Sequence, residues 1–286
     1  MPPPELTTRA LRRDPVQVVA VTGGKGGVGK STLSINLAVA CAAADRRVVL
    51  LDGDLGLANA DVLLGLTPQH SLADFIARRR GLDEVLTPAR PGLSIVAGAS
   101  GVLPLAELDT AGHVGIIRAF SELTADLDLL LVDTAAGISP GVLQLTQAAQ
   151  HVMVVVCDDP ASVTDAYAVI KILSRHHGLR QFRVVTNMTR EAHEGPRLFD
   201  ALQRVTERFL DVTLEHCADI PSDELLRRAA REQRPVVEAF PGAPSAQRIL
   251  RLADTLAGWA APEGRGNIGF FAERVARPAP RLQVVR

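Results

Sequence analysis

At 286 residues the chain is long enough for one large α/β domain or two small ones. A domain of this size can bury a sufficient core without the help of disulfides or bound metals. Hydrophobic residues make up 47% of the chain and aromatic residues 3%, while the net charge is −1, which argues against bulk electrostatic binding of nucleic acid; no direct DNA binding is expected. The three cysteines are widely spaced and form no C-x-x-C pair, which excludes a disulfide framework or a zinc site.

The N-terminal stretch has three consecutive prolines and no apolar core of the kind that signal peptides contain. We predict a disordered tail over residues 1–15 and one folded domain over residues 16–262. A linker and a short amphipathic segment are predicted over residues 263–286. No apolar run approaches the roughly 20 residues of a membrane span, so a cytoplasmic protein is expected.

Strand-like runs alternate with helix-like segments along the predicted domain. Strands are predicted at Val16–Thr22, Val48–Asp52, Leu93–Gly98, Leu129–Asp133, Val152–Cys157 and Arg183–Asn187. Helices are predicted at Ser31–Ala44, Ala111–Leu123, Gly141–Gln150, Ser162–Arg175, Pro196–Phe209, Ser222–Glu232 and Ser245–Ala257. Nearly continuous hydrophobicity indicates strands buried on both faces, as in parallel sheets. The alternation therefore predicts an α/β fold with a doubly wound, mostly parallel sheet.

The turn between the first strand and the first helix matches the phosphate-binding pattern G-x-x-x-x-G-K-[ST] at Gly24, Gly29, Lys30 and Ser31. Glycines let backbone N–H groups face phosphate oxygens, and the following helix adds the positive end of its dipole. The predicted nucleotide-binding residues of this loop are Gly24, Gly26, Gly27, Val28, Gly29, Lys30, Ser31 and Thr32. Lys30 is expected at the β- and γ-phosphates and Ser31 at Mg²⁺.

Lysine is rare in this chain, since only Lys25, Lys30 and Lys171 occur among 31 basic residues. A compact ammonium fits a phosphate-binding loop where a planar guanidinium does not, so the two loop lysines point to function. With Lys25, the loop resembles the deviant K-G-G-V-G-K-[ST] loop of the MinD/ParA ATPases. The resemblance implies that Lys25 reaches the partner's nucleotide in an ATP-dependent homodimer. By the same rarity, Lys171 is a candidate contact with a partner or with the second subunit.

Carboxylates follow two of the predicted strands. Asp52 and Asp54 lie two residues apart and so share a face at a strand end beside the phosphates. One can support a magnesium-bound water while the other orients the attacking water. By resemblance, Asp54 positions the water and Asp52 supports the magnesium shell, with Lys25 and Lys30 as the other catalytic residues.

Asp133 ends the strand Leu129–Asp133 in a Walker B arrangement, in which the carboxylate reaches Mg²⁺ through water. Gly137 gives the following segment a hinge that can sense the γ-phosphate. No glutamate follows Asp133, so we expect hydrolysis below the usual range of about 1–10³ per second. The predicted metal residues are thus Ser31, Asp52 and Asp133.

The base of the nucleotide is expected beside Asn187, Pro221 and Asp223. Asn187 follows a strand but does not begin the N-K-x-D motif of GTPases, which favours ATP over GTP. Pro221 and Asp223 resemble the family's second adenine-side loop. Asp223 also suits the N-cap of the helix that begins near Leu225, and both roles are compatible.

Several longer passages resemble one branch of that group, the flagellar-number regulators called FlhG or FleN. They include residues 54–66, 98–101, 133–138, 162–171, 208–212 and 270–274. The resemblance implies control of flagellar number and placement by restraint of an AAA+ flagellar transcription activator of the FleQ type. It also implies work with an FlhF-type GTPase, but the tail retains only Leu11-Arg12 of the D-Q-A-x-x-L-R activating motif. Stimulation of that GTPase is therefore not expected.

Other functions remain open at this stage. A MinD-like division-site ATPase is the main alternative. A ParA-like partitioning ATPase would need DNA-binding surfaces, which the net charge of the chain does not favour. In the C-terminal segment, Ile268, Phe271 and Val275 would share one face of a helix. Adjacent phenylalanines must bury somewhere, either on the domain itself or on a membrane in weak, reversible association at the inner face or the cell pole.

Overall fold

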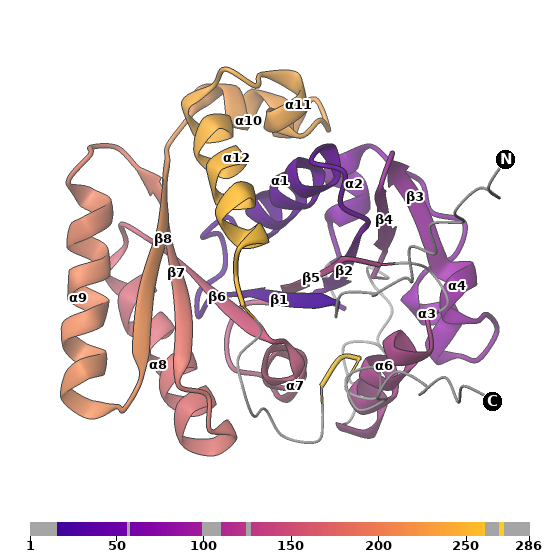
Figure 1. The fold of residues 1–286 in the computed structure, drawn as a ribbon, viewed down its shortest axis with the longest axis horizontal. Helices are drawn as coiled ribbons and strands as arrows, with labels where there is room; N and C mark the ends of the chain where they lie inside the picture. The colour runs from indigo at the N-terminus through magenta and orange to yellow at the C-terminus, as the bar shows by residue number, and fades with distance from the viewer. Residues whose placement is uncertain (1–15, 56–57, 99–109, 124–126, 261–268, 272–286) are drawn as a thin grey trace, which may run out of the picture.

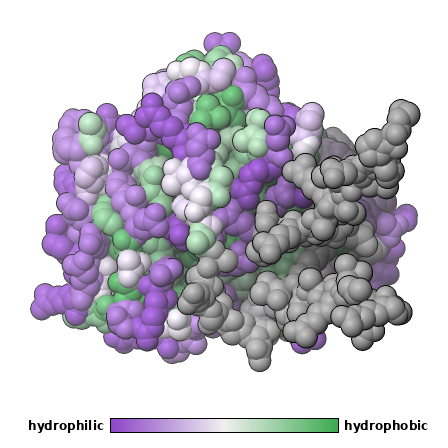
Figure 2. Space-filling view, in the orientation of Figure 1, coloured by the Kyte–Doolittle hydropathy of each residue, from purple (hydrophilic) through white to green (hydrophobic). Residues whose placement is uncertain are grey.

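A twisted sheet of eight strands forms the centre of the molecule, and helices cover both of its faces (Figure 1). The computed structural model describes residues 16–55, 58–98, 110–123, 127–260 and 269–271. The predicted tail over residues 1–15 and most of the segment 263–286 lie outside the described residues. No helix in the described ranges is long and apolar enough to cross a bilayer. On the face shown in Figure 2, hydrophilic residues cover most of the described surface, with smaller apolar patches between them.

The strand order is β3-β4-β2-β5-β1-β6-β7-β8. The strands are β1 Gln17–Thr22, β2 Val48–Gly53, β3 Leu86–Arg90, β4 Leu93–Val96, β5 Leu129–Thr134, β6 His151–Cys157, β7 Gln181–Thr189 and β8 Thr213–Pro221. Neighbouring strands run parallel except β3 and β4, which form an antiparallel pair at one edge. The predicted doubly wound, mostly parallel α/β fold is thereby confirmed.

The helices alternate with these strands and divide between the two faces. They are α1 Lys30–Ala43, α2 Ala60–Leu64, α3 Leu72–Ile76, α4 Leu82–Val85, α6 Thr110–Glu122, α7 Pro140–Ala148, α8 Pro160–His177, α9 Glu194–Phe209, α10 Glu224–Arg231, α11 Val236–Ala239 and α12 Pro244–Ala257. Helices α1 and α12 lie on one face, and α6, α7 and α8 lie on the other (Figure 1).

Both faces of the central strands are buried, which explains their continuous hydrophobicity. In β1, Val19 and Val21 belong to the core under α1 and α12, while Val18 and Ala20 belong to the core under α6 and α7. Alternate side chains of a strand point to opposite faces, so a strand between two helical layers needs apolar residues at every position. The two edge strands β3 and β8 lack this signature and were not predicted.

The two phenylalanines of the C-terminal segment are buried, as expected, against α6 and α7. The Phe270 ring meets that of Phe120 edge-on at a centroid distance of 5.6 Å, and the Phe271 N–H donates to Ser121 Oγ at 3.0 Å. However, Phe271 has φ of 60°, in the left-handed region. A right-handed helix cannot pass through such a residue, so the predicted helical face through Ile268, Phe271 and Val275 is wrong at its centre.

Candidate functional site

The predicted phosphate loop joins β1 to α1 at the carboxyl edge of the sheet. Gly29 caps α1 with φ of 89°, and a Cβ atom there would lie 2.3 Å from Asn187 Nδ2. A Cβ at Gly24 would lie 2.3 Å from the backbone carbonyl of Asp165 in α8. Only glycine fits both positions, because the first needs a left-handed backbone and both need close approach. The loop is thus shaped by its neighbours β7 and α8 as well as by its own sequence.

Lys30 lies buried at the start of α1, and its Nζ donates to the Lys25 carbonyl oxygen at 3.2 Å. Burial lowers the pKa of this ammonium, while the charges of Asp133 and Asp54 act in the opposite direction. The side chain therefore curls back over its own loop, where a phosphate would replace the carbonyl as its partner.

Asp52 and Asp133 lie opposite each other on the neighbouring strands β2 and β5, and both are almost completely buried. Burial raises the pKa of Asp133 to about 7, and repulsion from Asp52 adds to the effect. Burial also raises the pKa of Asp52 to about 6. A pair of buried carboxylates with raised pKa values is an environment that a divalent cation would relieve, so these residues fit Mg²⁺.

Ser31 and Ser34 lie on the first and second turns of α1, next to Asp133. The Ser34 hydroxyl donates to Asp133 Oδ1 at 3.0 Å, and a hydrogen bond from Ser31 lowers the pKa of the same carboxyl. The serine predicted to ligate magnesium therefore lies within hydrogen-bond reach of the predicted Walker B aspartate. Among the described residues there is no cluster of three or more His, Cys, Asp or Glu side chains, so any cation here would depend on hydroxyl, water and phosphate oxygens for the rest of its shell.

Asp52 also organises the loop that follows β2. Its two carboxylate oxygens accept backbone N–H groups from Asp54 at 3.2 Å and from Asn59 and Ala60 at 2.9 Å each. Asp54, at the start of this loop, is half-buried and close enough to Lys30 to influence its pKa. In this geometry Asp52 holds the loop that carries Asp54, a role that the sequence did not suggest.

The segment after Asp133 is attached to the phosphate loop by hydrogen bonds. The Thr134 hydroxyl donates to the Val21 carbonyl at 3.1 Å, and the Gly137 N–H donates to the Gly23 carbonyl at 3.1 Å. Gly137 has φ of 93°, which a residue with a side chain rarely adopts. The hinge residue Gly137 is therefore joined directly to the start of the phosphate loop by the hydrogen bond from its own N–H.

Lys25 forms an ion pair within its own chain. Its Nζ lies 2.6 Å from Asp159 Oδ2, and both side chains are somewhat more than one-third exposed. The other oxygen of Asp159 accepts the Ala161 N–H at 2.9 Å and so caps α8. The hydrogen bond to Lys25 holds the pKa of Asp159 below its ordinary value. Sequence reasoning missed this residue, although the Asp159-Pro160 step is a recognisable helix start.

The predicted base-side residues come from the ends of β7 and β8. Asn187 Nδ2 donates to the Val28 carbonyl at 2.8 Å, which ties β7 to the phosphate loop. Pro221 ends β8. Asp223 caps α10 by accepting the Leu225 N–H at 2.8 Å, and its second oxygen accepts from the Ser245 hydroxyl at 2.8 Å. The structural role expected for Asp223 is therefore present.

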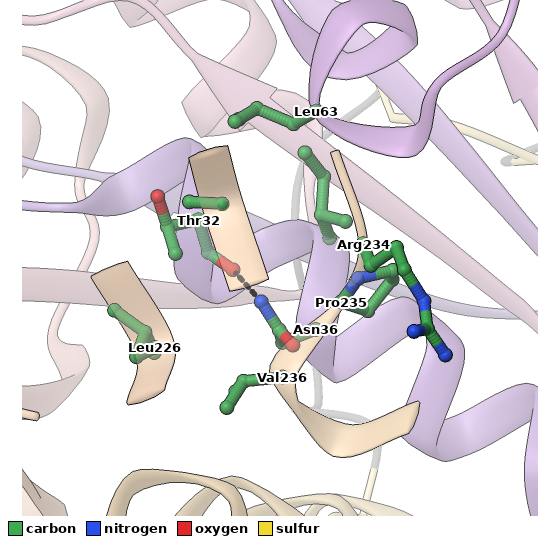
Figure 3. A pocket seen from close by; sticks show the side chains of 9 residues that line it. Thr32, Asn36, Leu63, Leu226, Arg234, Pro235 and Val236 are labelled. Atoms are coloured by element: carbon green, nitrogen blue, oxygen red, sulfur yellow. Dashed lines mark hydrogen bonds between the residues drawn. The ribbon is translucent and has the colours of Figure 1, made fainter. Parts of the chain in front are cut away.

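A small cavity lies one turn further along α1 (Figure 3). Asn36 Nδ2 donates to the Thr32 carbonyl at 2.8 Å on one side, and Leu226, Arg234 and Pro235 close the other. Its volume is about 10 Å³, room for no more than one water molecule. The cavity lies where α1 packs against α10 and α11, and it is too small for a nucleotide.

The model of the CobQ/CobB/MinD/ParA nucleotide-binding domain matches residues 19–236. The chain belongs to this family. It is 51% identical to the antiactivator FleN of Pseudomonas aeruginosa over 264 residues, covering 92% of this chain and 94% of that protein. It is 31% identical to the flagellum site-determining protein YlxH of Helicobacter pylori, covering 83% and 81% of the two chains.

Solved structures support the fold. The septum site-determining protein MinD of Pyrococcus horikoshii, solved with Mg-ADP, superposes with a TM-score of 0.72 at 26% identity, covering 85% of this chain and 98% of that one. The chain is therefore a MinD/ParA-type nucleotide-binding protein and a homologue of a flagellar antiactivator. The predicted kinship is confirmed in both respects.

Proposed function

We propose that this protein is an ATP-dependent dimerising switch that regulates flagellar number or placement by restraining a flagellar transcription activator of the FleQ type. The observation that carries the proposal is the 51% identity to the antiactivator FleN over almost the full length of both proteins. The division-site alternative is weaker, because the P. horikoshii MinD structure shares 26% identity over a similar span.

The proposed ATPase step assigns a role to each residue of the site. Backbone N–H groups of the loop and the Lys30 ammonium hold the phosphates, and Asn187, Pro221 and Asp223 line the base. Ser31 and Asp133 hold Mg²⁺, which neutralises phosphate charge when bound. Asp52 keeps the following loop in place, so that Asp54 can orient the attacking water. Only one acidic group then acts on the water, which agrees with slow hydrolysis.

The proposed dimer face is the carboxyl edge of the sheet. Val62, Ile138 and Met188 are large apolar residues there, and each is more than 40% exposed. Val62 and Ile138 follow β2 and β5, and Met188 is the second-last residue of β7. The carboxyl ends of these strands share one edge because the strands are parallel. Exposed apolar residues at the nucleotide edge suit a surface that a second subunit covers when ATP is bound.

Lys25 would change partner when this dimer forms. In the single chain it is held by Asp159 of α8. Both side chains are partly exposed, so water screens the pair and its loss costs little. A γ-phosphate across the interface offers Lys25 more negative charge than one carboxylate does. ATP binding by two subunits would thus draw Lys25 away from α8.

Light scattering with a slowly hydrolysed ATP analogue tests the switch. Wild-type protein should shift from monomer to dimer, Lys30→Ala should lose nucleotide binding, and Lys25→Ala should bind nucleotide but dimerise or hydrolyse poorly. A wild-type protein that stays monomeric with bound analogue contradicts the switch. Co-purification with a FleQ-type activator, and cell flagellation after deletion, test the regulatory role; an altered division site with normal flagellation would favour the alternative.

A further inference from the structure

A second concave site lies between the α3–α4 turn and α6, which are neighbours in Figure 1. Its volume is about 690 Å³, within the range of ligand-binding pockets, and it shares no lining residue with the nucleotide site. Phe75, Ile76 and Ile116 contribute apolar surface, and Arg78, Arg79 and Arg80 contribute three consecutive guanidinium groups. We call it the arginine hollow.

Two of the arginines are held in place by neighbouring carboxylates. Arg79 contacts Asp74 at 2.9 Å, and Arg80 contacts Glu84 at 3.0 Å. Each guanidinium has five N–H donors, so both retain donors for an additional acceptor. Among the lining residues that the structure describes, Glu84 is the one acidic side chain beside three arginines. Against Asp74 and Glu84, the described residues of the hollow therefore leave one guanidinium in excess, and the ion pairs fix the positions of Arg79 and Arg80.

Arg78 occupies a backbone position at which glycine would be more favourable than arginine. Its N–H donates to the Phe75 carbonyl and that of Arg79 donates to the Asp74 carbonyl, each at 2.9 Å. This pair of bonds is a Schellman helix end, in which the left-handed position favours glycine. Arg78 occupies that position with φ of 56°. Its side chain is exposed and makes no hydrogen bond or ion pair within the described part of the chain.

The chain offers direct comparisons for this position. Gly65 and Gly178 end α2 and α8 in the left-handed region with φ of 66° and 69°. Gln233 follows α10 with φ of 54° and repeats the paired bonds of the Schellman end. Gln233 is also exposed but lies outside the hollow. It is therefore a matched control for the backbone cost of a side chain at Arg78.

Gly115 of α6 forms part of the facing wall. A Cβ built there meets no heavy atom of the described residues within 4 Å, apart from its chain neighbours and the backbone of its own helix. The space beside the arginines is thus open on the α6 side and can receive an apolar side chain against Phe75 and Ile116. A flat membrane surface could touch the arginine rim but could not fill this concave apolar floor.

We propose that the arginine hollow binds a segment of a partner protein in which carboxylates flank a large apolar side chain. The carboxylates pair with the guanidinium groups, Arg78 foremost, and the apolar side chain packs on the floor. The proposal does not depend on the flagellar function, because it uses no residue of the nucleotide site.

Fluorescence anisotropy with labelled synthetic peptides tests this site on the full-length protein. The probe is a short peptide of leucine and glutamate, and the controls replace its glutamates by lysine or its leucines by serine. We expect wild-type protein to bind the probe about ten-fold or more tightly than either control. Arg78→Gly and Gly115→Leu should each weaken binding of the probe by about ten-fold or more, and Gln233→Gly should leave it unchanged.

Thermal unfolding and nucleotide binding of the same variants separate recognition from folding. Arg78→Gly and Gln233→Gly should both keep or raise the melting temperature, because glycine relieves the left-handed position. A loss of peptide binding in Arg78→Gly without a loss of stability supports the site. Equal binding by Arg78→Gly and wild type overturns the proposal. So does binding of phosphatidylglycerol vesicles through Arg78 in a protein that does not bind the peptide.

Discussion

The buried Asp133 carboxylate should destabilise the nucleotide-free protein, and Asp133→Asn should therefore stabilise it. The pKa of Asp133 is raised from 3.8 to about 7, chiefly by burial. A difference of one pKa unit corresponds to about 1.4 kcal/mol, so ionisation of Asp133 lowers the free energy of unfolding by at most about 4 kcal/mol. The asparagine has nearly the same shape and can still accept the hydrogen bond from Ser34.

The pH dependence follows from the direction of this shift. A folded-state pKa above the unfolded one gives stability that is fully present below pH about 3.8 and is lost as the pH rises through about 7. At pH 8 the wild type carries the whole cost, while at pH 5 its Asp133 is mostly protonated. Asp133→Asn should therefore raise the melting temperature by roughly 5–10 °C at pH 8, after allowance for the attraction that Lys30 loses, and by less than half as much at pH 5, where the cost is roughly 1–2 kcal/mol.

Differential scanning calorimetry without nucleotide measures this effect. Asp128→Asn is the matched control, because Asp128 lies just before the other end of β5 and Arg47 holds the pKa of its carboxyl below the ordinary value. That variant should lose stability at pH 8. Adding Mg²⁺ and ATP should stabilise the wild type much more than Asp133→Asn. An Asp133→Asn melting temperature at or below that of the wild type at pH 8 would refute the reasoning.

Four further expectations concern the switch. Asp54→Ala should reduce ATP turnover sharply while nucleotide affinity holds, and normal turnover would give Asp54 another role. Asp159→Asn keeps an oxygen to cap α8 but removes the charge that holds Lys25, so light scattering should show more dimer at a limiting concentration of ATP analogue; an unchanged dimer fraction contradicts the tether. Lys171→Arg preserves charge, yet it should weaken partner binding or alter flagellar number if the rarity of lysine reflects function. Normal partner binding and a normal flagellar number in this variant would contradict that inference. Hydrogen exchange at residues 269–271 should increase with a non-hydrolysable ATP analogue if the buried Phe270 and Phe271 are released on dimerisation, whereas constant protection means permanent packing.

Local signals in the sequence were sufficient for much of the fold. The central strands are buried on both faces, so their apolar runs were easy to recognise. The edge strand β8 was missed because its residues Glu215, His216 and Asp219 reach the margin of the sheet and need not be apolar. Strand β3 was missed because Pro88 is tolerated only at an edge, where one side of the ladder is unpaired.

The phosphate loop and the strand-end aspartates could likewise be found from sequence, because their chemistry depends on residues only a few positions apart. The pKa values and ion pairs of these residues could not be found from sequence. The raised pKa values of Asp52 and Asp133 arise chiefly from their burial in the folded sheet, and the Lys25–Asp159 pair joins residues 134 positions apart.

The C-terminal segment shows the same division. Hydrophobicity alone required Phe270 and Phe271 to be buried, but it could not tell where, and helical periodicity suggested the wrong backbone. Contacts with Phe120 and Ser121 place these residues on the domain, and the left-handed conformation of Phe271 goes with that position. The sequence determined which groups this protein must bury or present to a nucleotide, because composition and short motifs carry that information. Which groups meet, and with what charge, was decided by the tertiary structure, since distant segments become neighbours only when the sheet forms.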